Sequence, residues 1–262
     1  MRMAFSLSTS QAHSGYEEHT AQPTAELEAD RRLERRRLLI PFLPYVLISF
    51  LHCVLIVYNL PGSGFETKQL LMPALALAAA WSMWRVRPWP RGAMVLVLAA
   101  LTASWVGDGA GLFFAGLPTL PTMIGFFALA HIAYIVLFWR APGIAAPKRV
   151  PWWALVYAVW WVVTLAVVGP HAGALFIPLG IYGIVLGLTA AFSTRFGRTV
   201  AWGGAFFLIS DTFIALKEFM GVPQIISDVV IMPTYTLGQG LIVFGTVVLL
   251  RRRARSFGWL AD

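Results

Sequence analysis

Eight long apolar runs follow one another along this sequence, separated by short polar breaks. A hydrocarbon core about 30 Å thick is crossed by roughly 20 helical residues. The runs are continuous rather than alternating, and a helix satisfies its own backbone hydrogen bonds in lipid. The sequence therefore predicts an all-α, polytopic membrane protein that encloses a polar pocket. Its eight transmembrane helices are expected at about 38–59, 69–84, 92–109, 120–139, 151–169, 172–192, 199–217 and 230–250.

Charged residues are scarce and unevenly placed. Asp, Glu, Lys and Arg make up 12% of the 262 residues, about half the share of an ordinary soluble domain, which excludes a water-soluble fold. The net charge of +8 comes from basic residues that flank apolar runs, with five Arg in 31–37 and four in 251–255. Charge in these places is a topology signal, and we expect no nucleic-acid partner.

The basic residues also predict an orientation. If eight helices alternate in direction, 18 of the 20 Lys and Arg fall on one side, and only Lys68 and Lys217 fall on the other. The positive-inside rule then places both termini in the cytoplasm, and we expect a multi-pass protein of the plasma membrane. Three parts are predicted: a disordered tail at 1–37 that ends in an Arg-rich run, a membrane domain at 38–250, and a basic cytoplasmic tail at 251–262.

A few polar residues remain at membrane depth, where ionisable groups are costly and mark functional sites. The two acids are Asp108 and Asp211. Other polar residues lie three or four positions apart and so share a helix face. These pairs are Ser104 with Asp108, His131 with Tyr134, and Tyr235 with Gln239. Polar faces cost the least free energy in a membrane when they pack against one another and away from lipid. We therefore expect them to line one buried pocket, with Lys68 near its outer boundary.

Two interpretations of the acids stay open at this level. In a low-dielectric cavity, two neighbouring carboxyl groups have pKa values that are pushed apart. One is then protonated while the other is ionised, as an acid–base pair requires. Alternatively, each Asp only joins helices by hydrogen bonds, and His52 and His131 fit a packing role. No cluster of His, Cys and carboxylate residues has metal-ligand spacing in the sequence. A metal site built from His52, His131 and one Asp on different helices is still geometrically possible. We expect no metal and no cofactor.

Five stretches of the chain, in order, resemble the YhhN-like lysoplasmalogenase family of membrane proteins. They are T-K-Q-L-L-M-P-A-L at 67–75, S-W-V-G-D at 104–108, F-F-A-L-A-H-I-A-Y at 126–134, G-G-A-F-F-L-I-S-D at 203–211, and T-Y-T-L-G-Q-G-L-I-V at 234–243. The resemblance covers about 60–252. One departure is Gln69, where the family pattern has Pro.

The resemblance implies hydrolysis of the vinyl ether bond of a lysoplasmalogen, an alkenyl glycerophosphocholine or glycerophosphoethanolamine, to a fatty aldehyde. It implies Asp108 and Asp211 as catalytic residues. It also implies a substrate-binding or orienting set of Lys68, His131, Tyr134, Tyr235 and Gln239. The partners are then a lysophospholipid substrate and membrane lipids. The alternatives are a non-catalytic protein that binds or transports lysolipids or other amphiphiles, and a metal-assisted lipid hydrolase.

Overall fold

The computed structural model of the protein describes residues 36, 38–58, 60, 65–141 and 148–257. Contacts divide the chain into two compact units, Met1–Ile40 and Pro41–Asp262. The tail predicted at 1–37 lies almost wholly outside the described residues. The second unit holds the long helices that the structure describes.

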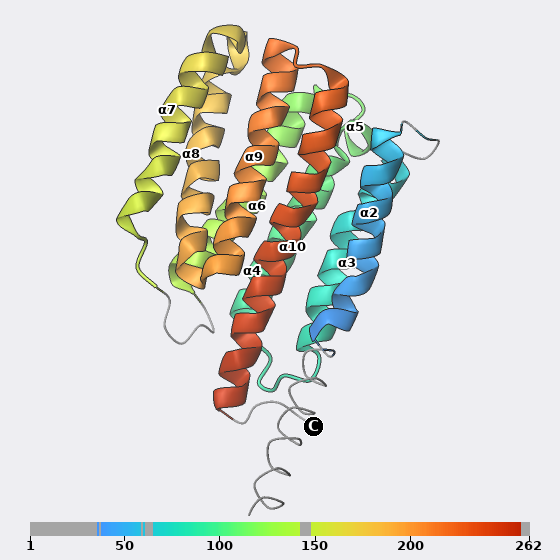
Figure 1. Cartoon of the computed structure of the whole chain (residues 1–262), viewed down its shortest axis with the longest axis vertical. Coiled ribbons are helices and arrows are strands. Elements are labelled where there is room, and N and C mark those ends of the chain that lie inside the picture. Colours follow the sequence, from blue (N-terminus) through green and yellow to red (C-terminus); the bar gives the residue numbers. More distant parts are fainter. Residues whose placement is uncertain (1–35, 37, 59, 61–64, 142–147, 258–262) are drawn as a thin grey trace, which may run out of the picture. The chain divides into compact units, whose positions relative to one another are not determined.

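Eight long helices run through the described residues of this unit (Figure 1). They are α2 (Leu43–Val57), α3 (Phe65–Met83), α4 (Arg91–Asp108), α6 (Thr119–Arg140), α7 (Val156–Val168), α8 (Phe176–Ser193), α9 (Arg198–Met220) and α10 (Gln224–Ser256). The short elements are α5 (Ala110–Phe113), η1 (Ile40–Phe42), η2 (Trp152–Leu155), η3 (Gly169–His171), η4 (Gly173–Leu175) and η5 (Thr194–Phe196). No strand occurs in the described ranges, so the predicted all-α fold is confirmed.

Seven of the helices are long and apolar enough to cross a membrane by length and composition. The eighth, α3, has 19 residues, and its first turn contains Glu66, Thr67 and Lys68, which lower its mean hydropathy. In Figure 1 it lies beside α2 among the other long helices. The prediction of a polytopic helical fold is therefore confirmed, although α3 lacks a segment as apolar as those of the other seven.

The last helix is longer than the apolar pattern predicts. It begins at Gln224 rather than near 230, and it continues through the basic run to Ser256 rather than ending near 250. Its final turn contains Arg253 and Arg255, and arginine is a good helix former that interacts favourably with the negative end of the helix dipole. The first half of the expected tail at 251–262 is thus helical, and 258–262 lies outside the described residues.

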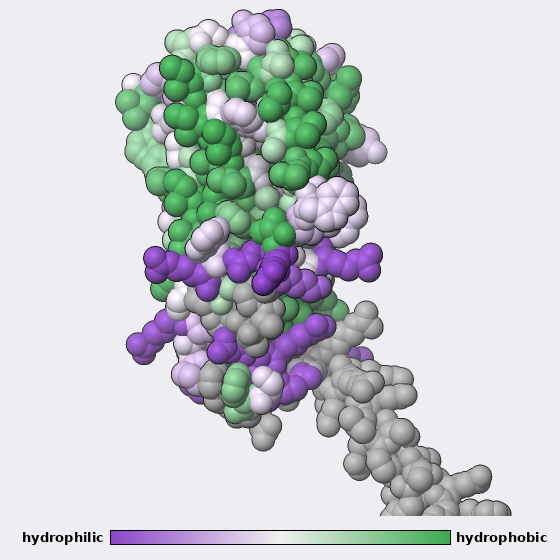
Figure 2. All heavy atoms as spheres, turned by 90° about the vertical axis from the view of Figure 1, so that its left-hand side faces the viewer, coloured by the Kyte–Doolittle hydropathy of each residue, from purple (hydrophilic) through white to green (hydrophobic). Residues whose placement is uncertain are grey.

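The helices alternate in direction, so α2 begins and α10 ends at the same end of this unit (Figure 1). Most described Arg and Lys lie at that end, which we call the basic end; Lys68 and Lys217 lie toward the opposite, far end. On the face drawn in Figure 2, hydrophilic residues gather below a broad apolar region. The large side chains exposed on the helices, such as Phe50, Leu77 and Ile177, are those that a hydrocarbon layer would cover.

Two arginines at the basic end bind the ends of other helices. Arg195 Nη1 donates hydrogen bonds to the carbonyl oxygens of Phe138 and Trp139, 2.7 Å away in each case, at the last turn of α6. Arg251 Nη1 donates to the carbonyl oxygen of Ser82, 2.6 Å away, at the end of α3. The final carbonyls of a helix lack partners within it, so these side chains fasten helix ends as well as carrying topological charge.

Glycines bring α9 and α10 into close contact. A Cβ atom added to Gly203 would lie 2.7 Å from the backbone nitrogen of Ile242, and one added to Gly238 would lie 2.8 Å from that of Phe207. Only glycine allows so close a backbone approach. The packing sets the register of Asp211 on α9 against Tyr235 and Gln239 on α10.

Candidate active site

Asp108 is the last residue of α4 and is held by two donors from other helices. The Lys68 ammonium, from the first turn of α3, lies 2.9 Å from Oδ1 of Asp108. The hydroxyl of Tyr235 on α10 donates to Oδ2 at 2.7 Å. The Asp108 side chain is 2% exposed and that of Lys68 is 26% exposed. Both carboxylate oxygens therefore have partners, and Lys68 reaches them from the less buried side.

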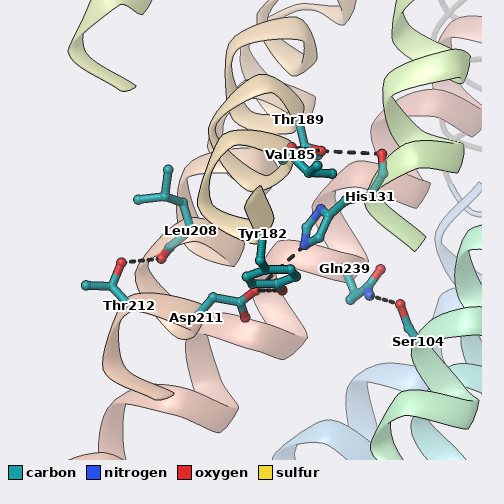
Figure 3. A network of polar contacts seen from close by, with 9 residues as sticks. All are labelled: Ser104, His131, Tyr182, Val185, Thr189, Leu208, Asp211, Thr212 and Gln239. Carbon is teal, nitrogen blue, oxygen red and sulfur yellow. Dashed lines mark hydrogen bonds and ion pairs between the residues drawn. The ribbon is translucent and has the colours of Figure 1, made fainter. Parts of the chain in front are cut away.

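Asp211 has a separate set of partners, from α6 and α8 (Figure 3). The hydroxyl of Tyr182 donates a hydrogen bond to Oδ2 of Asp211. Nε2 of His131 lies 3.7 Å from the same oxygen, which is longer than a hydrogen bond. His131 is fully buried. Three helices thus converge on this carboxyl group, and Tyr182 is its direct hydrogen-bond donor.

A third polar group lies deeper and consists of uncharged residues. The Tyr134 hydroxyl donates to Oε1 of Gln239 at 2.6 Å, and Nε2 of Gln239 donates to Oγ of Ser104 at 2.9 Å. All three residues are fully buried. This chain joins α6, α10 and α4, and its members satisfy one another as buried polar groups must. It acts as a polar joint between helices and contacts neither carboxylate directly.

Aromatic rings lie between the two carboxylate groups. The Tyr235 ring, whose hydroxyl binds Asp108, packs edge-on against Phe127 and Phe207, with centroids 5.9 and 5.5 Å apart. Phe207 in turn packs against His131 with centroids 4.5 Å apart. Among the bonds that the described residues form, none joins the two carboxylates or gives them a common partner. The structure brings the predicted residues into one interior region, where each carboxylate has its own hydrogen-bond donors.

A narrow pocket opens beside Asp211, between α6, α7, α8 and α9. Its walls are apolar apart from Asp211, Tyr182, Thr164, Thr212 and Glu218. Glu218 lies two helical turns from Asp211 toward the far end, so the pocket runs from a polar mouth to the carboxyl group. Phe127 forms part of the wall, whereas Asp108 and Lys68 do not line it. We call this space the Asp211 pocket; its cavity volume is about 50 Å³.

The family model described as the YhhN family matches residues 65–246, more than half of the chain. The chain belongs to the YhhN family. No curated protein and no solved structure matches it. All five stretches quoted from the sequence lie within the matched range. In this YhhN protein they supply both carboxylates, Lys68, and the Tyr134–Gln239–Ser104 chain.

The departure from the family pattern at Gln69 leaves α3 intact. The residue lies within α3, and its carbonyl oxygen accepts a hydrogen bond from Trp105 Nε1 at 3.1 Å. Trp105 belongs to the same stretch as Asp108. The bond therefore joins the turn that carries Lys68 to the turn that carries its acidic partner.

Sequence reasoning missed Tyr182, the donor to Asp211. On α8 it shares its face mainly with apolar and glycine residues, so no polar stripe marked it. A lone tyrosine in the middle of an apolar helix was the available signal, because its hydroxyl needs a partner when buried. Sequence reasoning also did not mark Glu218, near the end of α9. It is exposed, but it also lines the pocket mouth.

The two histidines considered for a metal site lie in different clusters. Nδ1 of His52 on α2 is 2.7 Å from the hydroxyl of Thr67, whereas His131 stands beside Asp211. Within the described residues, no group of three or more His, Cys, Asp and Glu side chains is placed to hold a metal ion.

Proposed function

We propose that this YhhN protein is a hydrolase that cleaves the vinyl ether bond of lysoplasmalogens to a fatty aldehyde and a glycerophospho head group. The observation that carries the proposal is the Asp211 carboxyl group, which faces an apolar pocket and accepts a hydrogen bond from Tyr182. Vinyl ether hydrolysis needs a proton donor at carbon, in surroundings that also accept a hydrocarbon chain. This site offers both.

Asp211 is the proton donor in this proposal. Its acid form gives a proton to the β carbon of the double bond, and the ether carbon becomes an oxocarbenium ion. Water adds to that carbon while the Asp211 carboxylate takes one proton from the water. The hemiacetal then breaks its bond to the glycerol oxygen, which takes the hydroxyl proton, and the aldehyde leaves. One carboxyl group thus serves both steps, because it alternates between acid and base.

Asp108 is the ionised partner. The Lys68 ammonium, 2.9 Å away, favours its charged form. Since Asp108 does not line the pocket, it does not deliver a proton. Its negative charge, behind the Tyr235 and Phe207 rings, stabilises the cation across a low-dielectric interior. His131 keeps its place beside Asp211, while Tyr134 and Gln239 hold the helices that carry the site. Lys68, from the expected substrate-binding or orienting set, holds Asp108 in this proposal.

The test is aldehyde release by purified protein from an alkenyl lysophospholipid. Asp211→Asn removes the proton donor and should lower kcat by about 10²–10⁴-fold, the usual contribution of a general acid. Asp108→Asn should lower it less. The matched control is Glu66→Gln, which removes an exposed acid near the far end and should leave the rate unchanged. Gel filtration and circular dichroism establish that each variant is folded.

The same assay separates the competing functions. A wild-type protein that binds lysoplasmalogen but releases no aldehyde is a binding or transport protein, and the proposal fails. Activity lost on chelation and restored by a metal ion indicates the metal-assisted hydrolase instead. Full activity of Asp211→Asn would remove the proposed acid.

A further inference from the structure

The Asp211 pocket is too small for a whole lipid. Its cavity volume of about 50 Å³ lies far below the roughly 300–1,000 Å³ of typical small-molecule sites. It has room for the reacting ether group but not for a long hydrocarbon chain. A lipid that reacts at Asp211 must therefore place its chain elsewhere.

An apolar groove adjoins the pocket on the side of α7 and α8. It has a cavity volume of about 510 Å³ and is lined by the segment that leads into α7, by η2, by the first half of α7 and by the second half of α8. We call it the α7–α8 groove. It shares two residues with the pocket, Trp161 and Gly183. Gly183 follows Tyr182, the donor to Asp211, so the groove begins next to a residue that binds the reacting carboxyl group.

Trp161 and Gly183 form the partition between the two spaces. A Cβ atom at Gly183 would lie 2.8 Å from Cδ1 of Trp161, so the indole rests directly on the glycine. Nε1 of Trp161 donates to the carbonyl oxygen of Gly180 at 2.9 Å, which fixes the ring by one bond. The α7 span, Trp152–His171, has the lowest buried share of the seven apolar spans. Trp161 thus lies on the span that has the smallest share of buried residues.

We propose that the hydrocarbon chain of the substrate displaces the Trp161 indole from Gly183, leaves the Asp211 pocket there and lies in the α7–α8 groove. This inference rests on the proposed function, since it takes Asp211 as the reacting group. The chain then runs toward the basic end, past Gly187 to Phe192, over a helix rise of about 13 Å. The head group remains at the pocket mouth near Glu218, so the lipid keeps the orientation it has in a leaflet at the far end.

A second groove starts at the same tryptophan but runs the other way. It has a cavity volume of about 500 Å³ and includes Leu165, Gly169 and Pro170, so it leads back to the far end. A chain in this groove would turn toward the layer where head groups and water lie. The α7–α8 groove instead continues through membrane depth, which is why we assign the chain to it.

Two matched substitutions on α8 distinguish these paths. Gly183→Leu fills the passage to the α7–α8 groove. Gly180→Leu makes the same change one turn away, where an added Cβ meets only Leu165 at 3.8 Å. The measurement is kcat/KM for aldehyde release from a long-chain and a short-chain alkenyl lysophospholipid. We expect Gly183→Leu to lower the long-to-short ratio by roughly tenfold or more, because each methylene that loses its apolar contact weakens binding severalfold.

The other variants fix the direction of the effect. Gly180→Leu should leave the ratio unchanged. Trp161→Ala removes the partition and should raise the long-to-short ratio. An unchanged ratio in Gly183→Leu, or a fall confined to Gly180→Leu, would overturn the assignment.

A binding measurement keeps this inference separate from the hydrolysis itself. An alkyl lysophosphocholine, which has no vinyl ether to cleave, carries a photoreactive diazirine at the end of its chain. After irradiation, peptides that cover 150–160 and 184–192 should carry the adduct. Adducts at 162–176 or on other helices would refute the path, even if the wild-type protein hydrolyses lysoplasmalogens. Adducts at the expected peptides without any aldehyde release would uphold the path and reject the hydrolase.

Discussion

Lys68 and Asp108 form an ion pair with 2.9 Å between Nζ and Oδ1, although one residue lies in the first turn of α3 and the other ends α4. The two partners differ in burial, because the Asp108 side chain is almost fully buried while about a quarter of the Lys68 side chain is exposed. Tyr235 completes the carboxylate's partners from α10. Three helices are therefore joined at a single carboxyl group near the far end.

Lys68→Met should destabilise the protein by about 1–3 kcal/mol, because it leaves a buried carboxylate without its cation. The cost is below that of a fully buried pair since Lys68 is partly exposed. Thermal unfolding in detergent measures it. Lys68→Met with Asp108→Asn should recover most of this stability while activity stays low. Wild-type stability in the single variant would show that the pair contributes nothing.

Tyr182→Phe should lower kcat about 10–100-fold, with little change in KM, because a hydrogen bond to a carboxyl group contributes about 1.5–3 kcal/mol. The ring remains in place, so the packing of α8 is preserved. Steady-state aldehyde release measures both constants. The control is Tyr58→Phe, which changes an exposed tyrosine and should have no effect. Equal rates for Tyr182→Phe and wild type would leave Asp211 without its proposed partner.

Gln239→Leu should destabilise the protein by about 1–3 kcal/mol, because Tyr134 and Ser104 both lose a buried hydrogen-bond partner. Adding Tyr134→Phe and Ser104→Ala removes the groups left unsatisfied and should restore part of the loss. The midpoints of thermal unfolding of four proteins, namely the wild type, Gln239→Leu, Tyr134→Phe with Ser104→Ala, and the triple variant, form a cycle that isolates the coupling. Strictly additive losses would contradict a connected chain.

Gly203→Ala should destabilise the protein by about 1–3 kcal/mol, as overpacking does, because its new methyl would lie 2.7 Å from the backbone nitrogen of Ile242. Gly125→Ala is the control on α6, since nothing lies within 4 Å of its added Cβ. The same methyl there should be neutral or stabilise by up to about 1 kcal/mol. Equal midpoints for the two variants would mean that α9 and α10 can separate freely.

Much of the helical framework followed from local patterns in the sequence. Each apolar run became a helix because a chain in lipid must satisfy its backbone internally, whatever its neighbours do. The predicted helix boundaries differed clearly from the observed ones where a helix begins or ends in polar residues. The first turn of α3 carries Glu66, Thr67 and Lys68, and α10 extends six residues past each predicted limit. Hydropathy marks the apolar part of a helix, whereas helix propensity continues into polar residues.

The sequence also located the site residues in part. Lys68, Asp108 and Tyr235 form one cluster, His131 and Asp211 meet at 3.7 Å, and Tyr134 binds Gln239. Spacing along a helix reveals which residues share a face. It does not reveal which neighbouring helix that face meets, so Tyr182 went unnoticed and the separate hydrogen-bond donors of Asp108 and Asp211 could not be predicted.

By itself, the sequence determined that the chain is a helical membrane protein of the YhhN type, where its helices lie, and which few ionisable groups remain inside them. These properties depend on local periodicity and on the cost of charge in lipid. Only the tertiary structure decided that Lys68 binds Asp108, that Phe127 and Phe207 stand between the carboxylates, and that Asp211 lines an apolar pocket. Such choices depend on how each helix is rotated against its neighbours, which close glycine contacts and side-chain packing set.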